Sequence, residues 1–146
     1  MASVDVLDRA SPPLLLAVGL ERTVEQTLFR LSQHTQAPYL ALSRAFAERL
    51  ADLAPRDRPR RAARLFHDLM RPTRGSLTIL DRTAILFAVD LMLNPLQLLI
   101  ETSRIHGPIV AAWCGNWDGT ILTYAVPEHP EHQRYVHPVV LVIPVV

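Results

Sequence analysis

The amino-acid sequence predicts a three-layer α/β domain built around a mostly parallel sheet. Short apolar runs alternate with longer amphipathic stretches along the 146 residues, and strands separated by helices are typical of parallel sheets covered by helices. The hydrophobic content of 49% and the charged content of 20% exclude a disordered chain. The length is that of one domain, so we expect a single domain over residues 1–146 with a lead-in over residues 1–12.

The first half of the chain predicts two strands and three helices. Residues 14–19 form an apolar run that stops at a glycine, as a buried strand does. Thr23 opens a capping box ahead of apolar residues at helical spacing. Residues 37–42 form a second apolar run. Ser43 can cap the next amphipathic helix, and we expect a third to begin at Pro59.

The second half continues the alternation. Residues 76–81 are the clearest strand, and residues 84–93 follow as a helical stretch. Asn94 can cap a further helix, which leads into a buried strand over residues 109–113. These elements complete the expected order of strands and helices for a sheet with helices on both faces.

The last part of the chain is rich in proline and histidine. Residues 120–125 predict a strand that pairs back on the strand over 109–113. Residues 127–138 are a polar connection, and residues 139–143 predict a final edge strand. The connection holds a candidate metal cluster of Glu128, His129, Glu131, His132 and His137. Metal ligands need fixed supports, and the prolines make this segment extended, so we expect no metal site.

The charge composition excludes several functions. The formal net charge is +1 at pH 7, and all 15 basic residues are arginines. So small a charge excludes nucleic-acid binding by bulk charge alone, and a chain without lysine has no Schiff-base or phosphate-loop lysine. The single cysteine, Cys114, excludes a disulfide framework and fits a reducing cytosol. The apolar runs 12–20 and 138–146 are too short to cross a bilayer, so we expect a cytoplasmic protein with no membrane partner.

A parallel sheet binds ligands beyond the carboxyl ends of its strands, which directs attention to the residues after the first strand. Gly19 fills the first glycine of a phosphate loop, G-x-x-x-x-G-K-[ST], but Val24 and Glu25 stand at the second glycine and the lysine. Valine resists the positive φ that a phosphate-binding loop can require, and glutamate repels phosphate. The nucleotide-binding candidates that remain here are Gly19, Arg22, Thr23 and Thr27.

The strand over 76–81 ends in a second candidate, Asp81. Mostly apolar residues before an aspartate are typical of a Walker B segment, whose aspartate holds the Mg²⁺ of a nucleotide; a helix cap is the alternative. No carboxylate follows within the next few residues, so a glutamate that activates water is missing. The order of strand, altered loop, helix and Asp81 predicts a P-loop NTPase-like domain with weak affinity for ATP and Mg²⁺ and without efficient hydrolysis.

The segment over 77–135 resembles BrxF, the small P-loop protein of type III BREX phage-defence systems. The resembling segments are 80–81, 85–87, 94–99 with Ser103 and Arg104, 110–113 with Gly115, 122–125, and 129–131 with Tyr135. The resemblance implies a P-loop NTPase fold and a role beside larger BREX proteins. This sequence departs from the family at the phosphate loop and at Ala84, where the family implies an acidic residue.

Seven of the arginines lie between positions 56 and 74. They are Arg56, Arg58, Arg60, Arg61, Arg64, Arg71 and Arg74. Three of them share one face of a helix that begins at Pro59, and guanidinium groups suit phosphate oxygens. A nucleic-acid or acidic-partner surface is one interpretation. A solvated helix face is the simpler one, because no aromatic residue interleaves to stack bases.

Arg104 and Cys114 allow two interpretations each, and the two tryptophans allow one. Arg104 ends a helix, where it could serve as an arginine finger for a neighbouring copy's nucleotide or stabilise the helix dipole. Cys114 could be a nucleophile, but no partner base is identifiable, and a packed thiol is the simpler interpretation. Trp113 and Trp117 are expected to pack the end of the sheet.

Two function hypotheses follow. In the first, the protein is an accessory subunit of a BREX-type phage-defence assembly, acting as a homo-oligomer with other defence proteins and with weak or no ATP hydrolysis. In the second, it is a DNA-binding or protein-adaptor module that works through the surface of Arg56–Arg74. Whether the protein is an enzyme, and whether nucleotide or DNA binds, is left open by the sequence.

Overall fold

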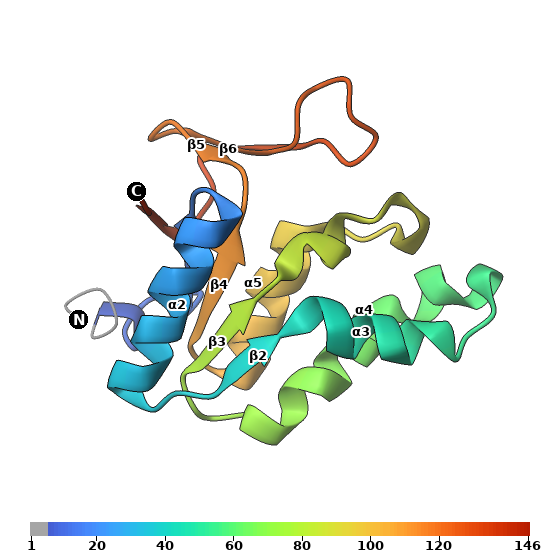
Figure 1. Ribbon diagram of the computed structural model, residues 1–146, viewed down its shortest axis with the longest axis horizontal. Coiled ribbons are helices and arrows are strands. Elements are labelled where there is room, and N and C mark those ends of the chain that lie inside the picture. Colours follow the sequence, from blue (N-terminus) through green and yellow to red (C-terminus); the bar gives the residue numbers. More distant parts are fainter. Residues whose placement is uncertain (1–5) are drawn as a thin grey trace.

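The computed structural model describes residues 6–146 and confirms the predicted α/β class. Five parallel strands form the main sheet in the order β2-β3-β4-β1-β8 (Figure 1). Their bounds are β1 Leu14–Val18, β2 Tyr39–Ala41, β3 Thr78–Asp81, β4 Ile109–Trp113 and β8 Leu141–Pro144. Residues 1–5 of the expected lead-in lie outside the described residues. Leu7, also in the lead-in, is buried in the same apolar cluster as Leu15 of β1 and Val24.

Helices cover both faces of this sheet and make the three layers. Helix α2 packs on one face, and α3, α4 and α5 contribute to the core on the other (Figure 1). Their bounds are α2 Glu21–Thr35, α3 Leu42–Ala51, α4 Arg58–Met70 and α5 Pro95–His106. Short 3-10 turns connect these elements: η1 Pro55–Asp57, η2 Arg71–Thr73, η3 Thr83–Phe87 and η4 Val89–Leu91.

The two central strands are apolar on both faces because helices lie on both sides. Every residue of β1 and β4 is buried. In β1, Leu14 and Leu16 point into the core shared with α3–α5, whereas Leu15 and Ala17 face α2. The strand is apolar at every position because its alternate side chains enter two different cores, one on each face of the sheet.

The position of β1 creates a switch point in the sheet. β1 pairs in parallel with β4 on one side and with β8 on the other. The chain leaves β1 through α2 toward β2, and after β4 it returns across β1 to reach β8. Connections that depart in opposite directions leave a crevice at the carboxyl ends of the two adjacent strands, and open α/β sheets bind their ligands there.

A second sheet corrects the prediction for the strand over 120–125. Strand β6 Ile121–Tyr124 pairs with β5 Asn116–Trp117 and β7 Gln133–Val136 in an antiparallel sheet, and not with β4. β4 is already paired on both edges, with β1 and β3, so it has no free edge. The expected connection over 127–138 contains β7, whose Tyr135 ring packs 5.8 Å from that of Trp113.

Several predicted boundaries also change. α2 begins at Glu21 rather than Thr23, with Leu20 as a cap that makes no side-chain hydrogen bond, and α3 begins before Ser43. The helix expected over 84–93 is wrong: Ala88, whose backbone is not helical (φ −57°, ψ 126°), separates η3 from η4. Asn94 caps α5 as predicted, because its side chain accepts a hydrogen bond from the Gln97 amide at 3.2 Å.

Candidate functional site

A hollow of about 480 Å³ opens at the carboxyl edge of the main sheet, beside the switch point. We call it the carboxyl-edge hollow. Loops after β1, β3 and β4 and the end of β6 line it with Gly19, Leu20, Glu21, Asp81, Arg82, Thr83, Ala84, Cys114, Gly115, Asn116, Tyr124, Ala125 and Val126. This is the edge at which the sequence predicts the nucleotide candidates, and it holds two of them, Gly19 and Asp81.

The connection from β1 to α2 is too short to surround a phosphate. Only Gly19 and Leu20 separate the strand from the helix. A Cβ on Gly19 would lie 2.5 Å from the carbonyl oxygen of Val145, whose amide donates to the Val18 carbonyl at 2.7 Å. Gly19 is therefore required for the close approach of the chain after β8. Phosphate loops use several successive amides around one phosphate, and two residues do not provide them.

The other candidates from this region lie on α2 away from the hollow. Arg22 and Thr27 are exposed and Thr23 is half-buried. None of the three is among the described residues that line the hollow, whereas Glu21 is. The early start of α2 accounts for this, since positions that the loop pattern places around a phosphate become the first two turns of a regular helix.

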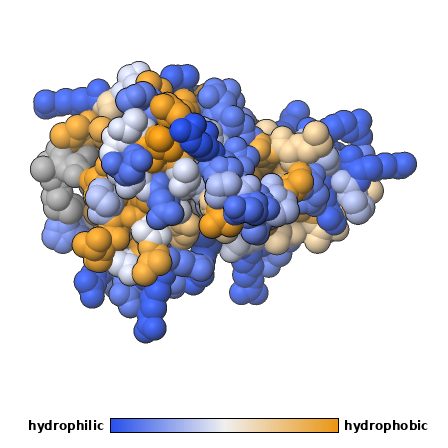
Figure 2. Space-filling model, turned by 90° about the horizontal axis from the view of Figure 1, so that it is seen from above, coloured by the Kyte–Doolittle hydropathy of each residue, from blue (hydrophilic) through white to orange (hydrophobic). Residues whose placement is uncertain are grey.

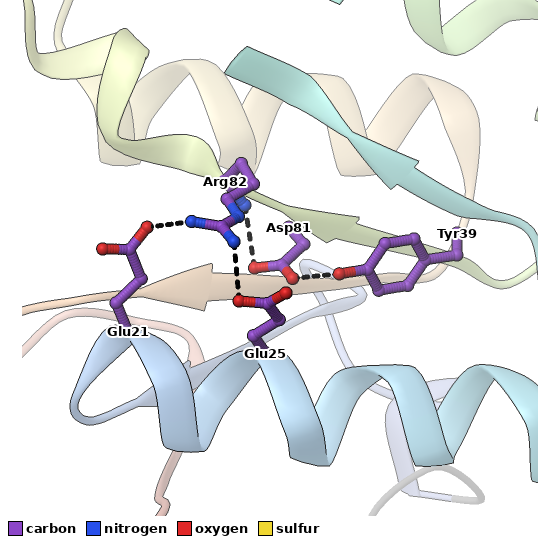
Figure 3. Close-up of polar contacts among 5 residues, drawn as sticks. All are labelled: Glu21, Glu25, Tyr39, Asp81 and Arg82. Carbon is purple, nitrogen blue, oxygen red and sulfur yellow. Dashed lines mark hydrogen bonds and ion pairs between the residues drawn. The ribbon is translucent and has the colours of Figure 1, made fainter. Parts of the chain in front are cut away.

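An acid–arginine network lies beside the hollow (Figure 3), and three of its members, Glu21, Asp81 and Arg82, line it. Arg82 follows β3 directly in the left-handed backbone conformation, with φ of 54°. Its guanidinium forms ion pairs with Glu21 and, at 2.6 Å, with Glu25, both on the first two turns of α2. The two glutamates, Glu25 first, raise the pKa of Arg82. The network thus joins the end of β3 to the start of α2.

Asp81 anchors the same network from inside the sheet. Its side chain is 2% exposed, and its Oδ1 accepts the Arg82 amide at 2.8 Å. Its Oδ2 accepts a hydrogen bond from the hydroxyl of Tyr39, which reaches across from β2 (Figure 3). Burial, followed by the hydrogen bond and charge of Asp81, raises the pKa of Tyr39. Both carboxylate oxygens therefore have protein donors.

Two further side chains at the hollow have structural explanations. Thr83 donates its hydroxyl to the Ala112 carbonyl at 2.5 Å and holds η3 against β4. Burial, assisted by the negative charges of Glu21 and Asp81, raises the pKa of Cys114 to about 11. The Cys114 thiol is therefore protonated near neutral pH, which disfavours a nucleophilic role.

The described residues of this hollow do not fit a magnesium nucleotide. Glu21 and Asp81 line it, and Arg82 is the single cation among its described lining residues. Arg82 is already paired with two glutamates, so the local charge is negative and opposes a polyphosphate. Ala84, which lines the hollow, carries no acid to orient water.

The arginine segment is partly used within the chain. Arg60 pairs with Asp57 at 2.5 Å and Arg71 with Asp68 at 2.9 Å, while Arg58 Nε donates to the Leu50 carbonyl at 3.1 Å. The remaining members, Arg56, Arg61, Arg64 and Arg74, are exposed. Hydrophilic side chains project around most of the outline seen in Figure 2 rather than gathering over one element. Arg104 is also exposed, in the last turn of α5, at the sheet edge opposite the hollow.

The histidine segment builds turns. His129 Nδ1 accepts the Glu131 amide at 3.0 Å, and His132 Nδ1 lies 3.1 Å from the Ala125 carbonyl. Within residues 6–146, no group of three His, Cys, Asp or Glu side chains could hold one metal ion. Trp113 is fully buried, and Trp117 packs half-buried against the larger core.

Four members of the network are not among the residues that the sequence predicts for the site. They are Glu21, Glu25, Tyr39 and Arg82. Arg82 directly follows Asp81, and Glu21 follows the first predicted strand, so a search for opposite charges after neighbouring strand ends would find that pair. Tyr39 has no such signal, because its contact depends on β2 lying beside β3.

Comparison with known proteins adds no relative: no family model, no curated protein and no solved structure matches the chain. Across residues 6–146, no helix has both the length and the apolar character needed to cross a membrane. Function therefore has to be inferred from the geometry of the chain itself and from its sequence.

Proposed function

We propose that this protein is an accessory subunit of a BREX-type phage-defence assembly, in which a P-loop-like α/β domain acts as a scaffold with weak or no ATP hydrolysis. The resemblance of residues 77–135 to BrxF supports the defence assignment. The observation that carries the scaffold assignment is the pairing of Arg82 with both Glu21 and Glu25. It fills the sheet edge with protein charges where a nucleotide enzyme of this fold keeps phosphates and Mg²⁺.

The start of α2 explains why this arrangement is stable without a ligand. The amino end of a helix carries partial positive charge and attracts anions, which is how it binds phosphate in many proteins. Here Glu21 lies in the first turn of α2 and supplies that negative charge itself. Arg82 then neutralises the glutamates from the β3 side. An internal anion takes the role that a bound phosphate would have.

The surface around the hollow supports a role in an assembly. Leu20 and Val126 line the carboxyl-edge hollow and are 79% and 61% exposed. Apolar side chains at the rim of a concave surface are typical of protein contacts. We propose that a partner, either another defence protein or a second copy of this chain in a homo-oligomer, covers this edge.

A phosphate-release assay tests the absence of hydrolysis. The purified protein, alone and with proteins encoded beside it, is incubated with ATP and Mg²⁺, with Asp81→Ala as the control variant. We expect release at the background rate in every case. Turnover of about 1 s⁻¹ or more that disappears in Asp81→Ala would refute the proposal.

Co-purification tests the assembly. We expect a tagged protein to retain a partner encoded beside it, and Leu20→Glu to lose that partner because a charge is placed in the contact. Val89→Glu is the matched control, since Val89 is an exposed apolar residue of η4, 56% exposed, that is not part of the hollow. Equal retention by all three proteins would contradict a contact at this edge.

A DNA-binding or adaptor role is the second candidate, and it is favoured by α4. Arg61 and Arg64 are exposed and form no ion pair with any described residue, so they are available to phosphates. Fluorescence anisotropy with labelled DNA tests it: Arg61→Gln with Arg64→Gln should weaken binding, whereas Arg44→Gln, on an exposed i,i+4 pair of α3, should not. Binding that is unaffected by the double substitution would exclude this surface.

A further inference from the structure

A second, smaller hollow lies at the opposite edge of the main sheet. It has a volume of about 210 Å³ and sits between the end of α4, η2 and the last turns of α5. We call it the α4–α5 hollow; its lining consists of His67, Met70, Arg71, Arg74, Thr102, Ile105 and His106. It shares no residue with the carboxyl-edge hollow, so it is a separate feature of the fold.

Two side chains that line this hollow each carry a buried polar atom without a partner. Thr102 is 2% exposed, and neither its Oγ1 nor Nε2 of His67 has a hydrogen-bond partner among the described residues. Both side chains line the hollow. Buried polar groups in folded proteins are nearly always paired, because an unpaired one loses its hydration without compensation. A ligand with hydrogen-bonding atoms in this hollow would offer partners to both groups.

The charges around the hollow are mainly positive. Arg71 and Arg74 line it, and Arg74 forms no ion pair with a described residue. Arg71 is paired with Asp68 through Nη2 at 2.9 Å, and its other guanidinium nitrogens take no part in this ion pair. The pKa of His106 is lowered by burial and, in addition, by the positive charge of Arg74. An anion in the hollow would therefore be attracted by nearby guanidinium groups.

The walls of the hollow are fixed before any ligand binds. His106 Nε2 lies within hydrogen-bond distance of the Thr73 and Thr78 hydroxyls, at 2.9 and 3.3 Å. The Gly75 amide donates to the His106 carbonyl at 2.7 Å. These contacts hold the end of α5, which carries Thr102, against η2 and the start of β3.

We propose that the α4–α5 hollow binds a phosphate group. The Thr102 hydroxyl can donate to a phosphate oxygen, as can the His67 ring in the tautomer whose N–H is at Nε2, and Arg74 and Arg71 supply the countercharge. The volume of about 210 Å³ is several times that of a water, about 30 Å³, and below the range of about 300–1,000 Å³ used by larger ligands. The phosphate is either a free anion or one phosphate of a nucleic-acid backbone.

Titration with inorganic phosphate, at ionic strength held constant with chloride, tests the site. We expect saturable binding by calorimetry that Arg74→Gln weakens about tenfold, as the loss of one charge-assisted hydrogen bond does. Thr102→Val keeps the shape and should weaken binding as well, with no loss of thermal stability in the free protein, since its hydroxyl has no partner to lose. Arg30→Gln, on the exposed side of α2, is the matched control and should bind as wild type does.

A competition arm identifies the source of the phosphate. Displacement of inorganic phosphate by a short single-stranded DNA assigns the site to a nucleic-acid backbone, and retention of phosphate in its presence assigns it to a free anion. Phosphate that does not saturate the wild-type protein would overturn the proposal. So would affinities of Arg74→Gln and Thr102→Val equal to that of Arg30→Gln.

Discussion

Replacing Tyr39 by phenylalanine removes one hydroxyl from the acid–arginine network and leaves the ring in place. That hydroxyl donates to Oδ2 of Asp81, which is 2% exposed. A hydrogen bond to a charged group contributes about 1.5–3 kcal/mol, and phenylalanine leaves no cavity behind. We therefore expect the free energy of unfolding to fall by about 2 kcal/mol. For a domain of this size the melting temperature should fall by about 4–8 °C.

Urea and thermal unfolding at pH 7 measure this loss, and Tyr124→Phe is the matched control. Tyr124 stacks on Phe87 with ring centroids 3.6 Å apart, and its hydroxyl has no hydrogen bond within residues 6–146. Removing that hydroxyl should change the free energy of unfolding by less than about 0.5 kcal/mol. Equal losses in the two variants would refute the reasoning, because the loss would then not come from the bond to Asp81.

The pH dependence gives an independent check on the same bond. The pKa of Tyr39 is raised in the folded protein, so the native state favours the protonated hydroxyl. The stabilisation is complete below the unfolded pKa of about 10 and is lost as the pH rises toward the folded value. The difference in unfolding free energy between wild type and Tyr39→Phe should be constant from pH 7 to about pH 9 and shrink above about pH 10. A difference that stays constant through this range would contradict it.

Four further predictions concern the carboxyl-edge hollow. Arg82→Gln should lower the free energy of unfolding by about 1 kcal/mol, because its ion pairs are partly exposed, and the loss should shrink in high salt; a salt-independent loss measured by urea unfolding would point to another cause. Gly19→Ala should cost about 1–3 kcal/mol, because its Cβ would meet the Val145 carbonyl; an unchanged melting temperature would contradict this close approach. Alkylation of Cys114 should be slow at pH 7.5 and accelerate toward its pKa of about 11, as followed by mass spectrometry; fast labelling at neutral pH would show an activated thiol. ATP with Mg²⁺ should leave the melting temperature unchanged, since a ligand raises it only by binding the native state; a saturable rise would show that the hollow binds nucleotide.

The sheet could be predicted from the sequence because its central strands carry a pattern that only two-sided burial explains. Residues 14–18 and 109–113 are apolar throughout, and both became central strands. For the strand over 120–125 the sequence predicts the wrong neighbour, β4 in place of β5 and β7. The residue pattern of one strand does not show that both edges of β4 are already paired. The 3-10 turns over 84–93 escaped prediction since their buried residues, Leu86, Phe87 and Leu91, fit a short helix equally well.

The candidate site was predictable in position but not in composition. Asp81 stands out because a carboxylate directly after an apolar strand is visible in sequence. Its partner Tyr39 comes from β2, more than forty residues earlier in the chain, and their contact exists only because β2 pairs with β3. The pairing of Arg82 with α2 likewise depends on α2 crossing back over β4 and β3. Such contacts follow from strand order, which local patterns do not encode.

The aromatic contact between the two sheets gives the molecule an internal optical reporter. The chain has two tryptophans, and Trp113 is fully buried at the end of β4. Its ring lies 5.0 Å from Phe87 and 5.8 Å from Tyr135, and its Nε1 donates to the Thr123 carbonyl at 3.0 Å. Separation of the antiparallel sheet from the parallel one would admit water to this indole and move its emission to longer wavelength. Intrinsic fluorescence of Trp117→Phe therefore distinguishes detachment of the small sheet from loss of the whole fold.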